Sequence, residues 1–299
     1  MQIVMYLISI LSILFLAGIH ELGHGLVASL LGLPVSYGLG MGKIIYQKGR
    51  FTLRLFPIAA YVDIPESLLD SLKAWKRNLI VIAGPLVNLI IAIAILSGIF
   101  TCIGYNTLNT NMGTITMVNN NPVLLPEQIT LIEKFSPPPY SITFADGRVI
   151  TVQDTSNITF IRDFNIFGAV KHALLFLIVI TKFTFISLVR DPAHSIAGPV
   201  GVVNILSSST SPILFLFLLG VISFSLFLLN ILPLLPLDGG WIVVYTLEGI
   251  LDRQMNSFRK VYYAIGMSFF VLLIALALMN DFGLTTRVLN TAFIKGGVV

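Results

Sequence analysis

The 299-residue chain is poor in charged residues and has a single cysteine. Asp, Glu, Lys and Arg make up 11% of it, whereas soluble globular proteins carry about 25%. With 56% hydrophobic residues and a mean hydropathy of +0.92, the chain lacks the polar groups to cover a water-facing surface. The lone Cys102 excludes an internal disulfide framework and a cysteine-rich metal site. The composition also excludes a disordered chain, a collagen-like chain and a nucleic-acid-binding protein, despite a pI near 9.2.

Long hydrophobic runs, by contrast, are frequent. Five apolar stretches cover about residues 4–31, 78–103, 168–189, 212–236 and 261–280. Each has about the 20 residues that a helix needs to cross a bilayer. The first lacks the basic start of a secretory signal peptide, since no Lys or Arg precedes Lys43. The sequence therefore predicts a multi-pass membrane protein.

Basic residues are concentrated between the first two apolar stretches. Segment 32–77 holds Lys43, Lys48, Arg50, Arg54, Lys73, Lys76 and Arg77 against three acidic residues, whereas 104–165 holds three basic residues against five acidic ones. Because cytoplasmic loops of membrane proteins are enriched in Lys and Arg, we place 32–77 inside the cell. The amino terminus and residues 104–166 are then extracytoplasmic.

The external segment shows the alternation of β-structure. Strand-like runs occupy 113–118, 140–144 and 148–152, and Ala145-Asp146-Gly147 between the last two is a hairpin turn signal. Residues 119–122 and 137–139 are rich in Asn and Pro and are predicted loops. At about 60 residues this part is too short for a large core, so we expect a small β domain.

Two histidines and a glutamate stand together inside the first apolar stretch, in the segment His20-Glu21-Leu22-Gly23-His24. Histidines four residues apart share one face of a helix, so both imidazoles can bind one cation. Glu21 is rotated from His20 by about 100° and can act as a general base beside the metal. This is the pattern of zinc hydrolases. Because ionisable groups inside a membrane helix are costly and mark functional sites, we interpret the segment as part of a metal centre.

A catalytic zinc ion takes three protein ligands and keeps one open position. His172 and His194 flank the third apolar stretch, but Asp238 is the strongest candidate for the third ligand. It follows two prolines that interrupt helical hydrogen bonding at the end of the fourth stretch. Irregular backbone at membrane depth is tolerated where it is buried in protein or lines a wet cavity. We therefore predict a metal ligand at Asp238, with Asn230 satisfying freed backbone groups or holding a substrate amide.

Together these motifs resemble the site-2 protease family of intramembrane zinc metalloproteases, and most closely its bacterial regulator-of-sigma-E protease branch. The motifs are His20-Glu21-x-x-His24 and Asn230-x-x-Pro233-x-x-Pro236-Leu237-Asp238-Gly239, and the segments 83–88, 198–201 and 279–282 are also similar to that branch. The resemblance implies that His20, His24 and Asp238 bind Zn2+. It further implies that Glu21 is the general base and that Asn230 binds the substrate or stabilises the transition state.

The topology must bring both motifs to the same side of the membrane. With the amino terminus outside, His20 and His24 lie in the inner half of the first span, so the fourth stretch must run inward to place Asp238 beside them. The third stretch, 168–189, then cannot cross, and we predict that it lies in the membrane plane. The predicted fold is a membrane α-helical protein with four transmembrane helices, a membrane-associated β-hairpin, an in-plane helix and a small external β domain.

Three parts follow along the chain. Residues 1–103 form a first transmembrane half with the histidine motif, 104–166 form the external β domain, and 167–299 form the surface helix and a second transmembrane half with Asp238. In the resembled family the external part carries one or two PDZ domains. Segment 104–166 is too short for one and lacks their Gly-Leu-x-x-Gly-Asp signature, so we interpret it as a degenerate or replacement module.

A glycine-rich segment, 38–43, precedes a predicted hairpin with strands 44–47 and 51–56 and a turn at 48–50. It resembles the β-loop that dips into the membrane beside the active site in the site-2 protease family. An exposed strand there can pair with an unwound substrate by β-addition. We expect Gly40, Lys43 and Arg54 of this hairpin, with Asn230, to contact the substrate.

The predicted function is an endopeptidase that cuts transmembrane segments in the bacterial cytoplasmic (inner) membrane, with its active site toward the cytoplasm. The expected partners are single-pass membrane proteins, such as anti-sigma factors, or leftover signal peptides, together with the lipid bilayer. No nucleic acid is expected. Two other classes stay open: a metal or proton transporter that uses the same side chains as a relay, and an adaptor that binds membrane helices without cutting them.

Overall fold

The computed structural model describes residues 2–108, 115–118, 121–122, 140–144, 149–152, 160–190 and 196–283. Its helices are α1 Gln2–Leu30, α2 Glu66–Asp70, α3 Ala74–Ile103, α5 Ile166–Arg190, α6 Pro199–Ser207, α7 Pro212–Asn230, α8 Asp238–Leu251 and α9 Asn256–Asp281. Its strands are β1 Ser36–Lys48, β2 Phe51–Asp63, β3 Tyr105–Leu108, β4 Ile115–Val118, β5 Asn121–Pro122, β6 Tyr140–Phe144, β7 Val149–Val152 and β8 Phe160–Asp163. The chain divides into one compact unit of Met1–Ala92 with Ser187–Val299 and a second of Ile93–Ile186.

Five helices in the described part of the chain are long and apolar enough to cross a membrane: α1, α3, α5, α7 and α9. They coincide with the five apolar stretches of the sequence, so the prediction of a helical membrane protein is confirmed. Helix α5 meets the same criterion of length and composition as the other four. Its in-plane placement, and with it the number of four spans, therefore stays a prediction.

The fourth apolar stretch is interrupted near its end, as the two prolines predict. Helix α7 ends at Asn230, and residues 231–237 form an irregular connection before α8 begins at Asp238. Pro233 and Pro236 lack the N–H that a helix needs, which explains why the helix does not continue to residue 236. The segment 198–201, which is similar to a loop of the resembled branch, starts a helix in this structure. Gly198 is the N-cap of α6, and Pro199 begins that helix.

Helix α3 occupies the centre of the first unit. Of the 18 most apolar consecutive residues of α3, 44% are buried, whereas the corresponding share in the other candidate spans is 11–22%. Ile80 of α3 packs in a fully apolar cluster with Ala28 of α1, while the next residue, Val81, packs with Leu235 and with α8. Because lipid is as apolar as these side chains, their contacts stabilise the helix packing through van der Waals attraction. These two clusters place α1 and the start of α8 against the same helix.

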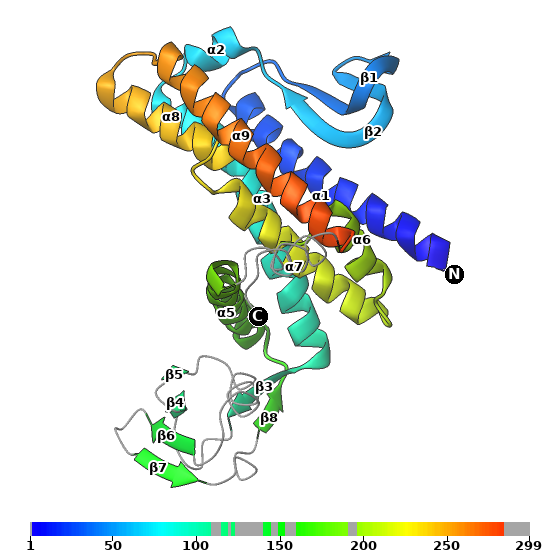
Figure 1. Ribbon diagram of the computed structural model, residues 1–299, viewed down its shortest axis with the longest axis vertical. Helices are drawn as coiled ribbons and strands as arrows, with labels where there is room; N and C mark the ends of the chain where they lie inside the picture. The colour runs from blue at the N-terminus through cyan, green and yellow to red at the C-terminus, as the bar shows by residue number, and fades with distance from the viewer. Residues whose placement is uncertain are drawn as a thin grey trace, which may run out of the picture. The chain divides into compact units, whose positions relative to one another are not determined.

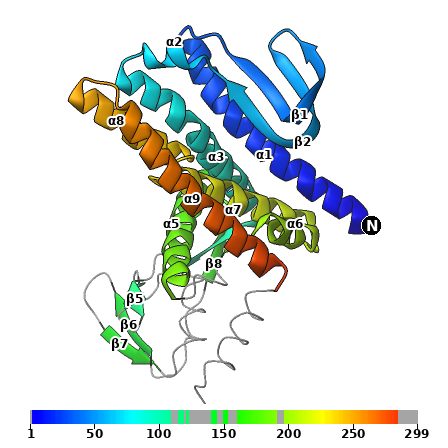
Figure 2. The same cartoon turned by 45° about the horizontal axis from the view of Figure 1, so that its top comes forward.

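The hairpin of β1 and β2 lies along α1, as both views show (Figures 1 and 2). Its strands are longer than predicted, because residues 36–43 and 57–63 also take part. The ribbon folds over itself: residues 37–39 have partners at 60–62 on one side and at 51–53 on the other. Segment 60–63 is thus an outer edge, with no further strand paired to it among the described residues.

The second unit carries the predicted external β-structure. Strands β5, β4, β6 and β7 form a four-stranded sheet in that order, and β3 pairs with β8. The predicted strands at 140–144 and 148–152 appear as β6 and β7, and the one at 113–118 is described over 115–118. Residues 121–122, predicted as loop, pair with β4 as β5. The predicted turn 145–147 and the loop residues 119–120 and 137–139 lie outside the described residues.

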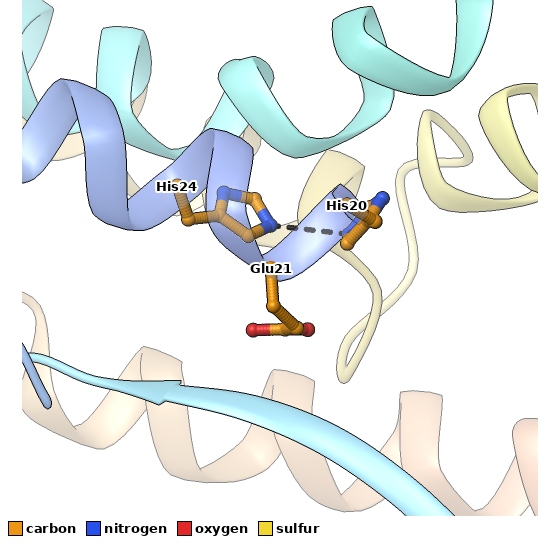
Figure 3. A group of neighbouring side chains, drawn as sticks. All are labelled: His20, Glu21 and His24. Carbon is orange, nitrogen blue, oxygen red and sulfur yellow. Dashed lines mark hydrogen bonds between the residues drawn. The ribbon is translucent and has the colours of Figure 1, made fainter. Parts of the chain in front are cut away.

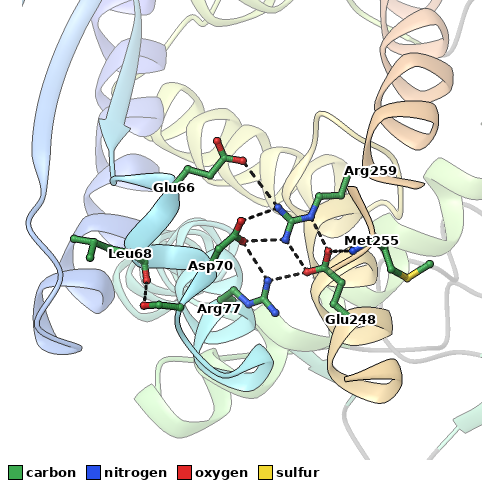
Figure 4. Close-up of polar contacts among 8 residues, drawn as sticks. Glu66, Leu68, Asp70, Arg77, Glu248, Met255 and Arg259 are labelled. Carbon is green, nitrogen blue, oxygen red and sulfur yellow. Dashed lines mark hydrogen bonds and ion pairs between the residues drawn. The ribbon is translucent and has the colours of Figure 1, made fainter. Parts of the chain in front are cut away.

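A buried ion cluster joins four helices of the first unit (Figure 4). Glu248 of α8 is 3% exposed and accepts from Nε and Nη2 of Arg259 at 2.7 Å each. Nη1 of Arg77 donates to Glu248 at 2.8 Å, and Arg259 also pairs with Asp70 at 2.9 Å. The two positive and two negative charges balance. The cluster therefore ties α8 to α2, α3 and α9.

Replacing Arg259 by Ala should destabilise the protein strongly. The change leaves Glu248 buried with one cation less, and breaking a buried pair in this way costs about 3–5 kcal/mol. Thermal unfolding in detergent measures the effect. Lys260→Ala, an exposed neighbour on α9, is the matched control and should stay within about 0.5 kcal/mol of wild type. Equal unfolding of the two variants would contradict a stabilising role for the cluster.

Acid should weaken the same cluster. Burial by itself raises the pKa of Glu248, but hydrogen bonds from Arg259, from the Met255 N–H and from Arg77 outweigh it and hold the pKa below the usual 4.5. A carboxyl with a lowered folded pKa stabilises the fold above its unfolded pKa, and this contribution is lost as the pH falls through the folded value. We expect the unfolding temperature of the wild type to drop below about pH 4.5, and to drop less in Glu248→Gln. Parallel pH profiles for the two proteins would be the contrary result.

Candidate metal centre

Helix α1 carries both histidines on one buried face. His20 and His24 are each 8% exposed, and their Nε2 atoms lie 3.1 Å apart (Figure 3). Gly23 lets α1 approach α3 closely, because a Cβ there would lie 2.8 Å from the carbonyl oxygen of Ala83. The imidazoles thus face α3 and the start of α8 rather than lipid.

Asp238 meets both histidines. Its Oδ2 lies 3.1 Å from Nε2 of His20 and 3.4 Å from Nε2 of His24. The residue is the first of α8, so the irregular connection after α7 sets its position. Within that connection Leu235 is fully buried, and Tyr262 of α9 donates a hydrogen bond to the carbonyl oxygen of Pro233. Both contacts fix the backbone that leads into Asp238.

The three atoms fit a bound zinc ion. Bonds of about 2.0–2.1 Å in a tetrahedron separate neighbouring ligand atoms by about 3.3 Å, and the observed separations are 3.1, 3.1 and 3.4 Å. Oδ2 of Asp238 is buried without a hydrogen-bond partner in the described part of the chain. A buried carboxylate oxygen in that state is costly unless a cation binds it.

The absence of a side chain at Gly84 of α3 leaves the room that an ion would need. A Cβ on Gly84 would touch Nε2 of His24 and lie 2.8 Å from Nε2 of His20. It would therefore stand in the space toward which the ligand atoms converge. Gly84 belongs to segment 83–88, which is similar to the resembled branch, but spacing in the sequence does not link it to the histidines, because that link depends on how α1 and α3 pack.

Glu21 lies beside the two histidines but points to the hairpin (Figure 3). It belongs with the two histidines to a group whose potential ligand atoms lie within 4.8 Å of one another. Its Oε2 accepts a hydrogen bond of 2.9 Å from the N–H of Val62 in β2. Asp238, at 3.1 and 3.4 Å, is the closer carboxylate to the imidazoles. Glu21 thus lies next to both histidines, and its role as general base stays a prediction.

The structure gives less support for the other residues predicted for the site. The side-chain amide of Asn230 donates to the carbonyl oxygen of Leu226 at 2.9 Å, and no described contact joins Asn230 to His20, His24 or Asp238. Of the alternative ligands, His172 packs between two aromatic rings. Its ring centroid lies 4.9 Å from that of Phe100 and 5.1 Å from that of Tyr105. His194 lies outside the described residues.

The three hairpin residues have mainly internal contacts. Arg54 donates to the hydroxyl of Tyr61 and to the carbonyl oxygen of Gly42, at 2.9 Å each. Gly40 is buried with φ +100°, and a Cβ there would lie 2.6 Å from the carbonyl oxygen of Phe56. Lys43 is exposed. Arg54 and Gly40 thus shape the hairpin, and substrate contact by any of the three stays a prediction.

Comparison with known proteins identifies the family to which this chain belongs. The family model for peptidase family M50 matches residues 8–274. The chain belongs to this family. As a member of this family, the site-2 proteases, it is a zinc metalloprotease, which answers the question that the sequence left open between a protease, a transporter and an adaptor.

Relatives from several bacteria agree with the assignment. A protein of Synechocystis is 26% identical, with 94% of this chain and 93% of the relative covered. Proteins of Clostridium acetobutylicum and Campylobacter jejuni are 24% and 25% identical, each over 92% of this chain and over 96% and 92% of their own lengths. All three carry the provisional name of zinc metalloprotease.

Replacing Gly84 by Ala should exclude zinc from the M50 site. The added methyl group would occupy the space between the two Nε2 atoms, so the zinc content should fall from about one ion per chain toward zero. Metal analysis of the detergent-purified protein measures this. Gly98→Ala, on the same helix with open space around the new methyl, should keep the wild-type content. Retention of zinc by Gly84→Ala would show that the ion binds elsewhere.

Proposed function

We propose that this protein cuts transmembrane segments of other membrane proteins within the bilayer. The observation that carries the proposal is the position of the metal centre. Both histidines are part of α1, a 29-residue helix long and apolar enough to span a membrane, and Asp238 follows the end of α7, another such helix. A zinc site built on spanning helices acts where a membrane-embedded peptide bond would lie.

The residues present support peptide hydrolysis. We propose His20, His24 and Asp238 as the zinc ligands. Bound zinc supplies Lewis-acid polarisation and makes a water molecule acidic enough to ionise near neutral pH. Glu21 would take the proton from the attacking water and return it to the leaving amine. Its hydrogen bond to Val62 orients the carboxylate beside the ligands.

The hairpin offers a surface for an unwound substrate. Segment 60–63 is the outer edge of the folded ribbon, and the N–H of Val62 points from it to Glu21. A substrate strand added to this edge would run directly beside the proposed general base. Pairing of this kind would hold the peptide in an extended form, whose bonds are open to attack, unlike those of a helix. Asn230, at the end of α7, is proposed to bind the substrate from the other side.

We further propose the bacterial cytoplasmic membrane as the location, with the amino terminus and 104–166 outside and the active site toward the cytoplasm. The distribution of Lys and Arg around α1 and α3 supports this orientation. In that setting the substrates would be single-pass proteins such as anti-sigma factors, or leftover signal peptides.

Glu21→Gln should abolish cleavage and leave zinc binding intact. Glutamine keeps the size of the side chain but cannot accept a proton, and loss of a general base lowers rates by about 10²–10⁴. The measurement is cleavage of a model transmembrane substrate in detergent or proteoliposomes, with metal analysis in parallel. Glu66→Gln, an exposed glutamate of the same unit, should cleave like the wild type. Cleavage by Glu21→Gln at the wild-type rate would contradict the assigned base. Cleavage of soluble peptides alone by the wild type would contradict the intramembrane substrate.

A further inference from the structure

In each histidine of the metal centre, Nε2 faces the metal position and the other ring nitrogen, Nδ1, lies within hydrogen-bond distance of a group on α3. Nδ1 of His24 lies 2.9 Å from the carbonyl oxygen of Ile80, and Nδ1 of His20 lies 3.1 Å from Nδ2 of Asn88. Oδ1 of Asn88 is buried and has no hydrogen-bond partner in the described part of the chain, and exchanging the two ends of the amide would bring it to Nδ1 of His20. Ile80, Gly84 and Asn88 are four residues apart, so they share one face of α3. That face forms a second wall of the site.

The two partners on α3 differ in how strictly they fix the tautomer of the histidine. A carbonyl oxygen accepts hydrogen bonds but cannot donate, so His24 must carry its hydrogen on Nδ1, which leaves the lone pair on Nε2 free for a metal. The amide of Asn88 can present either end to His20, since both ends have the same shape. With the NH2 end toward Nδ1, the neutral ring of His20 would carry its hydrogen on Nε2 and could not bind zinc. With Oδ1 toward Nδ1, the hydrogen stays on Nδ1 and Nε2 is free.

We propose that Asn88 is a positioning residue whose side-chain oxygen accepts from Nδ1–H of His20, and so holds His20 in the tautomer that binds zinc through Nε2. The inference rests on the proposed function, because it assumes that His20 and His24 bind one zinc ion together.

The surroundings of Asn88 suit this role. The residue is fully buried, so no exchange with bulk water competes for its amide. Its backbone carbonyl accepts a hydrogen bond of 2.8 Å from the hydroxyl of the fully buried Ser223 on α7. The turn of α3 that carries Asn88 is thereby fixed between α1 and α7. Partners of this kind behind a metal ligand typically change metal affinity by about 10–100-fold when they are removed.

The test compares two substitutions of similar size at position 88. Asn88→Asp can only accept a hydrogen bond, and Asn88→Leu can do neither. We expect the aspartate variant to bind zinc at least as tightly as the wild type and the leucine variant to bind it about 10–100-fold more weakly. Zinc affinity is measured on the full detergent-purified chain by competition with a chelator. The absorption of Co2+ in the visible range reports whether the site is still tetrahedral.

Control variants separate the hydrogen bond from general damage to α3. Asn78 lies on the same helix and donates to Thr246 at 2.9 Å, away from the site. Asn78→Asp and Asn78→Leu should both bind zinc like the wild type. If Asn88→Leu does not fold, Asn88→Ala replaces it as the variant without an acceptor and should bind zinc about 10–100-fold more weakly than Asn88→Asp.

Two results would overturn the inference while the proposed function stands. One is a wild type that binds zinc and cleaves, with Asn88→Leu binding zinc equally tightly. The other is an Asn88→Asp variant that binds zinc at least about 10-fold more weakly than the wild type, since a hydrogen-bond acceptor at position 88 would then not support zinc binding. A wild type that binds no zinc would overturn the proposed metal site itself, and the role of Asn88 with it.

Discussion

The structure depends on one electrostatic constraint: three electron-rich atoms converge in a buried place. Nε2 of His20, Nε2 of His24 and Oδ2 of Asp238 lie 3.1–3.4 Å from one another. Such atoms repel one another and lose their hydration on burial, so the arrangement is stable only with a cation or protons between them. A divalent ion satisfies all three atoms at once. The close packing of α1 on α3 and the break after α7 both serve to hold this convergence.

The position of Asp238 is controlled from both ends of α8. At its start, the buried Leu235 and the bond from Tyr262 to Pro233 fix the entering backbone. Toward its end, Glu248 is held by two arginines from α3 and α9. Helix α8 is 14 residues long, so its length is about 21 Å. A helix fixed at both ends can neither slide nor rotate, and this keeps its first residue within ligand distance of α1.

Much of this arrangement could be predicted from the sequence. The i, i+4 spacing of His20 and His24 is a local property, and helical periodicity alone places both on one face. The prolines before Asp238 signal a break, and a charged residue after a break in an apolar run points to a site. Long apolar runs fix the five long helices to within a few residues, because burial and backbone hydrogen bonding leave few alternatives in lipid.

Contacts between helices could not be predicted in this way. Gly84 and Asn88 are 64 and 68 residues from His20, and which face of α3 meets α1 depends on the packing of whole helices. The sequence predicts that Arg54 contacts the substrate, and it did not reveal that two N–H groups of Arg54 donate to Tyr61 and Gly42 within the folded hairpin. The charge pattern of residues 32–77 predicted a cytoplasmic segment, and it did not reveal that Asp70 and Arg77 belong to a buried cluster with α8 and α9.

X-ray absorption at the zinc edge of the purified protein tests the metal centre most directly. His20, His24 and Asp238 as ligands predict two imidazoles and one carboxylate oxygen around a single zinc ion, with bonds of about 2.0–2.2 Å. Asp238→Ala should lose the carboxylate and keep both imidazole signals. A sulfur ligand, a third imidazole, or a spectrum unchanged by Asp238→Ala would contradict the proposed site.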